Sequence, residues 1–173
     1  MLSSELADEA YARYAIEANQ GTTFLATFRA IAKKYPTRPA SKILDDLVAS
    51  TLGQQGKWFA VARDAGLYNE AIALALRTPC DPRTLTRAAR DFAASNPPFA
   101  VEVGLAALRW IAAGYGHEIT GLDVLAACSS TIDAAKNPGL VDETEKRIGD
   151  LISGPRSTSK DFIAAASGTR RDS

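Results

Sequence analysis

Cysteine and histidine are scarce in this sequence of 173 residues. It contains two cysteines and one histidine. A zinc site needs about four well-spaced cysteine, histidine or carboxylate ligands, and Cys80, Cys128 and His117 share no such motif. We therefore expect no metal ion and no cofactor. Cysteines that lie outside any paired motif are typical of reduced thiols in a cytoplasmic protein.

Net charge and long apolar runs are also absent. Twenty basic residues balance twenty acidic residues, so no overall field attracts the chain to nucleic acid or to an anionic membrane. The longest apolar run, residues 103–113, is interrupted by Arg109. Residues 1–6 show neither a basic nor an apolar signal-peptide region. We expect no secretion signal and no membrane-spanning segment.

Signatures of catalysis are missing as well. The chain has no Gly-x-Ser-x-Gly, Walker-type or dinucleotide-binding motif. His117 and Glu118 could form an acid–base pair, because imidazole titrates near neutrality. The alternative that we favour is a loop histidine close to the end of the preceding helix. We therefore expect no catalytic residue and a protein that is not an enzyme.

The sequence does contain a pattern typical of a helix pair, and this pattern occurs twice. The segment Ala62-Arg63-Asp64-Ala65 ends one amphipathic stretch, and Ala89-Arg90-Asp91-Phe92 ends another 27 residues later. A turn and a second helix follow each segment. A helix pair that recurs at such a period buries its apolar faces against neighbouring pairs. We predict an all-α fold of about nine helices without a β-sheet, in which antiparallel helical hairpins stack as a short right-handed α-α superhelix.

This array is expected to form one helical-repeat domain over residues 1–153, followed by a flexible polar tail over residues 154–173. A first helix with Leu6 and Tyr14 on its apolar stripe should end near Gly21. The next should begin after a cap at Thr22 or Thr23 and stop before Pro36. The apolar faces of later helices are predicted to include Ile43, Leu44, Leu47 and Val48; Trp58, Phe59, Ala62 and Ala65; Leu67, Ala71, Leu74 and Ala75; Leu85, Ala88, Ala89 and Phe92; Val103, Ala107, Trp110 and Ile111; and Val124, Leu125, Cys128 and Ile132.

Helix ends can be placed from local signals. Asp81-Pro82 is typical of an N-cap followed by proline in the first turn. Asn96-Pro97-Pro98 should separate two helices, and the second of these should run over residues 99–113 before Gly114-Tyr115-Gly116 ends it. Thr120 and Asp123 resemble a capping box. The last helix is expected over residues 141–152.

The stretch from Gly66 to Pro82 resembles the second helix of a tetratricopeptide-type unit. The residues that carry the resemblance are Gly66, Tyr68, Glu70, Ala71, Ala75 and Pro82. The segment from Lys57 to Gly116 also resembles the shorter helix pairs of clathrin-type α-solenoids, because its repeat is shorter than the ~34 residues of a standard tetratricopeptide unit. The resemblance implies a scaffold that binds a peptide or protein along a concave surface.

Three arginines form the main polar constellation. Arg83, Arg87 and Arg90 are spaced i, i+4, i+7, which places them on one helix face, opposite the apolar stripe. Arg77 and Arg109 could widen this arginine stripe into a site for phosphate groups or acidic side chains. The alternative is a solvated face balanced by Asp81 and Asp91. Four aromatic residues could likewise stack on bases or line a peptide groove, but their helical spacing favours the core: Trp58, Phe59, Trp110 and Tyr115.

Two functions follow from the sequence. The first is a non-enzymatic protein–protein interaction module that recognises a protein or peptide partner in the cytoplasm. The second is a binder of nucleic acid or another phosphoryl ligand that uses the arginine stripe. The sequence does not define an oligomeric state. The absence of obvious polar capping helices also suggests a fragment of a longer protein.

Overall fold

The computed structural model describes residues 2–15, 23–136 and 138–153. Within these ranges the chain forms nine α-helices, one π-helix and one 3-10 helix, and it forms no strand. The predicted all-α class and number of helices are therefore confirmed. The chain divides into two compact units, Met1–Ala71 and Ile72–Ser173. The single domain over residues 1–153 and the right-handed superhelix stay predictions, and the expected polar tail lies outside the described residues.

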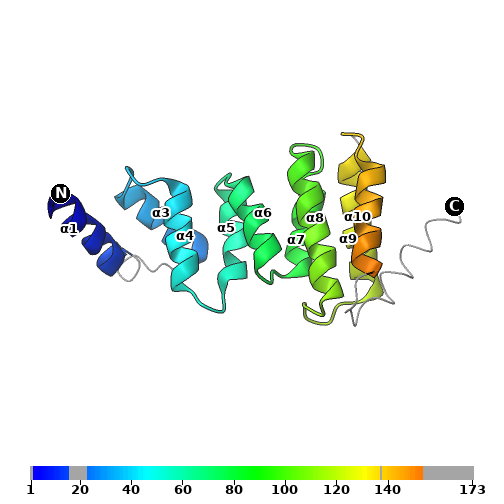
Figure 1. Ribbon diagram of the computed structural model, residues 1–173, viewed down its shortest axis with the longest axis horizontal. Coiled ribbons are helices and arrows are strands. Elements are labelled where there is room, and N and C mark those ends of the chain that lie inside the picture. Colours follow the sequence, from blue (N-terminus) through cyan, green and yellow to red (C-terminus); the bar gives the residue numbers. More distant parts are fainter. Residues whose placement is uncertain (1, 16–22, 137, 154–173) are drawn as a thin grey trace, which may run out of the picture. The chain divides into compact units, whose positions relative to one another are not determined.

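The first unit is built around Trp58 and the apolar stripes of two helices. Thr23 caps the helix that follows it, because its hydroxyl accepts a hydrogen bond from the amide of Ala26. The ring of Phe24 contacts Trp58 edge-on at 4.7 Å between centroids. The predicted stripe of Ile43, Leu44, Leu47 and Val48 is buried. The helices of this unit are α1 (Leu2–Ala10), the π-helix η1 (Tyr11–Ala15), α3 (Phe24–Lys34), α4 (Ala40–Ser50), the 3-10 helix η2 (Gln55–Lys57) and α5 (Trp58–Asp64) (Figure 1).

The N-terminal helix differs from the prediction. Its α-helical part ends at Ala10 and continues as a π-helix, and Leu6, expected on the apolar stripe, is 63% exposed. The buried side chains among the described residues of this segment are Tyr11 and Ala15, and the ring of Tyr11 contacts that of Tyr35 edge-on with 5.0 Å between centroids. The change of helical pitch after Ala10 alters which residues share a face. The Tyr14 side chain and Gly21 lie outside the described part of the chain.

The second unit is organised around its most buried helix. The helix α8 contacts α7, α9 and α10, and twelve of its sixteen residues are buried. Such a helix is apolar almost all round because it has neighbours on several sides. The helix α6 (Tyr68–Arg77) crosses the boundary between the two units. The helices that follow are α7 (Pro82–Phe92), α8 (Pro97–Ala112), α9 (Gly121–Lys136) and α10 (Val141–Ser153) (Figure 1).

The start of α8 corrects one predicted boundary. Asn96 is its N-cap and accepts a hydrogen bond from the Phe99 amide, so Pro97 and Pro98 belong to the helix and do not separate it from α7. Proline is tolerated there because the amides of a first turn have no intrahelical partner. The other end matches the prediction. Gly114 has φ +86°, and the amides of Gly114 and Tyr115 close the last turn onto Ile111 and Trp110.

Besides Leu6, two residues on the predicted apolar faces of later helices, Ala65 and Leu125, are exposed. Ala65 is the C-cap of α5, and the chain leaves the helix directly after it, where Gly66 has φ +76° and Leu67 donates back to the carbonyl of Ala62. Leu125 is 38% exposed on α9, whereas its neighbours Val124 and Cys128 are buried. Leu125 therefore lies outside the stripe that α9 buries.

Gly104 allows α8 and α9 to approach closely. A Cβ atom added there would overlap the hydroxyl of Thr131, which is buried and donates to the carbonyl of Ala127 at 2.6 Å. We predict that Gly104→Ala lowers the free energy of unfolding by about 1–3 kcal/mol, although alanine is the better helix former. The measurement is urea unfolding followed by circular dichroism.

The control for this substitution is Gly149→Ala. Gly149 lies in α10, and a Cβ atom there meets no atom within 4 Å. Alanine should therefore leave the stability unchanged or raise it by up to about 1 kcal/mol. Equal effects of the two substitutions would contradict the close contact between Gly104 and Thr131.

Candidate functional site

The arginine stripe lies on α7, as the sequence predicts. Asp81 caps this helix: its carboxylate accepts hydrogen bonds from the amide of Thr84 at 3.2 Å and from its hydroxyl at 2.9 Å. The cap and Pro82 fix where the helix begins, and with it which residues share a face. One face buries Leu85, Ala88 and Ala89, and the other exposes Arg83, Arg87 and Arg90.

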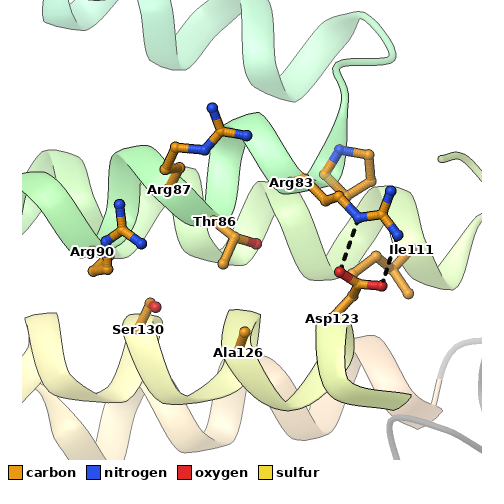
Figure 2. Close-up of a pocket in the computed structure, with 9 residues that line it drawn as sticks. Arg83, Thr86, Arg87, Arg90, Ile111, Asp123, Ala126 and Ser130 are labelled. Carbon is orange, nitrogen blue, oxygen red and sulfur yellow. Dashed lines mark hydrogen bonds and ion pairs between the residues drawn. The ribbon is translucent and has the colours of Figure 1, made fainter. Parts of the chain in front are cut away.

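The exposed face of α7 borders a groove whose other wall is α9. Figure 2 shows the side chains of both helices, with Arg83 reaching across to α9 and Arg87 extending away from it. The groove has a volume of about 220 Å³. We call it the α7–α9 groove. Its lining residues are Pro82, Arg83, Thr86, Arg87 and Arg90 from α7, Ile111 from α8, and Asp123, Ala126 and Ser130 from α9.

Arg83 and Asp123 close one end of the groove. The guanidinium group of Arg83 donates from Nε to Oδ1 of Asp123 at 2.9 Å and from Nη2 to Oδ2 at 3.1 Å, and Nη2 also donates to the carbonyl of Glu118 at 2.9 Å. Asp123 further accepts from the amide and the hydroxyl of Thr120. Asp123 therefore stabilises the start of α9, as the predicted capping box requires, and also neutralises Arg83.

These contacts determine the charge of Asp123. The hydrogen bonds from Arg83 and then from the Thr120 amide hold the pKa of the Asp123 carboxyl well below its usual range. A carboxylate with a lowered pKa in the folded state stabilises that state above its unfolded pKa, near about 4. This stabilisation is lost as the pH falls through the folded-state pKa.

We therefore predict that Asp123→Asn destabilises the protein at neutral pH and that the difference from the parent shrinks below about pH 4. Urea unfolding of both proteins at neutral pH and at the lowest pH where both remain folded measures this difference. Glu118→Gln is the control, because Arg83 contacts the backbone carbonyl of Glu118 and not its carboxylate. A difference between Asp123→Asn and the parent that is equal at both pH values would contradict the ion pair.

The remaining two arginines of the stripe differ from each other. Arg90 forms an ion pair with its neighbour Asp91 at 2.9 Å, with both side chains more than half exposed. Exposed pairs of this kind contribute little to stability. Arg87 forms no ion pair or hydrogen bond with any residue that the structure describes. A guanidinium group at the edge of the groove is thus available to an external anion.

The structure does not bring together every arginine that the sequence singled out. Arg77 is exposed in the last turn of α6 and does not line the groove. Arg109 borders a different pocket of about 340 Å³, together with Leu76, Leu105, Ala106, Arg147, Asp150 and Leu151. There Arg147 is held by Glu102, through hydrogen bonds of 2.6 and 3.0 Å. Arg83, Arg87 and Arg90 are therefore the arginines of the groove.

Of the two aspartates that were expected to balance the arginine stripe, Asp91 pairs with one of its arginines and Asp81 does not. Asp91 pairs with Arg90, but Asp81 is occupied by its cap on Thr84, and the partner of Arg83 is Asp123. This partner could not be predicted from the sequence because it lies 40 residues away along the chain. The capping box identified Asp123 as a helix-start residue. No local pattern connects it with Arg83.

The aromatic residues are mostly in the core, as predicted. Trp58 and Phe59 are each 1% exposed, and Trp110 is 8% exposed. The prediction is wrong for Tyr115, which is 46% exposed and whose ring lies nearly perpendicular to that of Trp110, with 5.1 Å between centroids. This position follows from the end of α8, where the residue after Gly114 packs back on the last turn.

The side chains of the other chemical candidates do not line the groove. His117 and Glu118 have side chains that are 90% and 81% exposed, with 3.8 Å between Nε2 and Oε1. Burial raises the pKa of the Cys80 thiol to about 11, so it is protonated at neutral pH. Among the described residues no group of three or more metal-ligating side chains converges. None of the described helices combines the length and apolar character needed to cross a bilayer.

No protein family, curated protein or solved structure matches this chain. The resemblance to tetratricopeptide-type and clathrin-type repeats therefore stays a prediction that rests on the residues between Lys57 and Gly116. The candidate functional site of the described residues is the α7–α9 groove with its three arginines.

Proposed function

We propose that the protein is a non-enzymatic interaction module and that its α7–α9 groove binds an acidic segment of a partner protein. The observation that carries this proposal is Arg87, a guanidinium group without a carboxylate partner among the described residues, at the edge of a groove. Guanidinium groups bind carboxylates through two parallel hydrogen bonds. A carboxylate of a partner protein would form an ion pair with Arg87, as the carboxylate of Asp123 does with Arg83.

The size of the groove supports a protein segment as ligand. Its volume of about 220 Å³ is below the range of about 300–1,000 Å³ typical of pockets for small-molecule ligands. One or two side chains fit such a space. Beyond Asp123, the wall formed by α9 consists of the short side chains of Ala126 and Ser130, which leaves room for a chain to lie along the groove (Figure 2).

Charge argues for a protein ligand over nucleic acid. Nucleic-acid binding depends on several basic side chains that are free to contact successive phosphates. In the groove, Arg83 is neutralised by Asp123 and Arg90 is shared with Asp91, and the chain as a whole has a net charge of +0. With two carboxylates beside three arginines, the groove offers one uncompensated guanidinium group, which suits a single carboxylate better than a row of successive phosphates.

The test is selection of random peptides on the immobilised full chain, followed by affinity measurements on synthesised peptides by fluorescence anisotropy. We predict that the selected peptides are acidic and that Arg87→Glu weakens their binding at least about tenfold. Arg77→Glu makes the same change of charge outside the groove and should change the affinity less than about twofold.

Two outcomes would contradict the proposal. Failure to select acidic peptides, or equal effects of Arg87→Glu and Arg77→Glu, would remove the groove as a protein-binding site. Binding of a labelled single-stranded oligonucleotide that is lost with Arg87→Glu and falls steeply with salt would favour the phosphoryl ligand instead.

A further inference from the structure

Two exposed leucines continue the groove over the surface of α9. Leu122 is 77% exposed and Leu125 is 38% exposed, whereas the other large apolar residues of this helix are buried. Leu122 lies one turn before Ala126, which lines the groove, and three residues before Leu125. Residues spaced three or four apart are neighbours on a helix surface. Leu122, Leu125 and Ala126 therefore form a small apolar patch at the edge of the groove.

The α7–α9 groove and the apolar patch together form a surface with one basic side and one apolar side. The side on α7 carries Arg87 and Arg90, and the side on α9 carries the apolar patch. At 100° per residue, Asp123, Ser130, Ala126 and Leu122 follow one another around α9 within about 100°. A ligand in the groove that contacts Ala126 can thus reach Leu122 by extending outward over α9.

From these two sides we infer that the partner segment is an amphipathic helix with acidic residues along one edge and apolar residues along the other. This inference rests on the proposed function and names the chemistry of the partner. A helix that lies along a valley between two helices presents residues three or four positions apart to each wall. Arg87 and Arg90 are separated by a rise of about 4.5 Å along α7, which equals the rise between two acidic residues spaced i, i+3 on a partner helix. Arg90 already pairs with Asp91, but this pair is exposed and contributes little, so Arg90 can share its guanidinium group with a second carboxylate.

The test uses four peptides of equal length and the full chain. The first carries glutamates along one edge of a helix and leucines along the other, the second replaces glutamate with glutamine, the third replaces leucine with serine, and the fourth scrambles the order of the first. We expect the first peptide to bind at least about tenfold more tightly than each of the others and to gain helical circular dichroism on binding.

Protein variants show whether binding takes place on this surface. Leu122→Ser should weaken binding of the first peptide about fivefold to tenfold. The control is Leu52→Ser, which removes a leucine that is 83% exposed in the other unit and should leave the affinity unchanged. Both leucines are exposed, so neither substitution should unfold the protein.

The outcomes separate this inference from the proposed function. Acidic peptides that bind through Arg87 but are insensitive to Leu122→Ser, or that bind without gaining helix, would overturn the amphipathic helix and leave the interaction module standing. Absence of any binding that depends on Arg87 would overturn both. Self-association of the full chain in sedimentation, abolished by Leu122→Ser, would assign the patch to a second copy and also overturn the inference.

Discussion

Replacing Trp110 with alanine is expected to lower the free energy of unfolding of the second unit by about 3–5 kcal/mol, the range for emptying a large aromatic site in a core. The indole is 8% exposed, lies against the Tyr115 ring and donates from Nε1 to the carbonyl of Ala75 at 2.7 Å. The substitution leaves a cavity and removes this hydrogen bond. Urea unfolding followed by circular dichroism measures the loss.

The hydrogen bond to Ala75 has a specific cause. Within a helix, the carbonyl of Ala75 would accept from the amide four residues later, but that residue is Pro79, which has no amide hydrogen. Trp110 supplies the missing donor. The control Trp110→Phe keeps most of the packing and should lose about 1–3 kcal/mol, the cost of a buried carbonyl without a partner. If both variants are as stable as the parent, Trp110 does not hold α8 to this part of the chain.

Replacing Trp58 with alanine is expected to have an effect of similar size, about 3–5 kcal/mol, on the first unit. Trp58 is 1% exposed, packs against Phe24 and donates from Nε1 to the hydroxyl of Thr51 at 2.7 Å. Thr51 is the C-cap of α4, so the indole joins the end of one helix to the start of α5. Thermal and urea unfolding report the loss.

The control for Trp58 is Thr51→Val, which keeps the shape of the partner but removes its hydroxyl. It should cost about 1–3 kcal/mol, because the indole N–H is then buried without an acceptor. The chain has two tryptophans, one in each unit, so each alanine variant leaves one tryptophan as a fluorescence probe. If the unfolding transition followed by the remaining tryptophan shifts as much as the transition followed by circular dichroism, the chain unfolds as the single domain that the sequence predicts.

Helices and their ends could be predicted from sequence because their signals are local. Asp81 with Pro82, and Thr120 with Asp123, act within one helical turn, and glycine at Gly114 is needed where φ is positive. The stripe on α7 follows in the same way from a period of 3.6 residues. These features need no knowledge of the tertiary structure.

The site depends on contacts that no local pattern specifies. The pairing of Arg83 with Asp123 spans 40 residues, and it decides which arginines remain available. The exposure of Leu122 and Leu125 depends on which helices pack against α9, and the contact between Trp110 and Ala75 depends on how α8 meets the end of α6. Only this last contact had a local signal, the proline four residues after Ala75.

The boundary between the two compact units falls between Ala71 and Ile72, inside α6. This boundary is not a linker. Its peptide bond lies within a hydrogen-bonded helix and is therefore a poor site for proteolysis. An experimenter who wishes to express the C-terminal half alone should therefore begin ahead of Tyr68 and keep α6 whole. A fragment that starts at Ile72 would carry half a helix with unpaired amides at its new end.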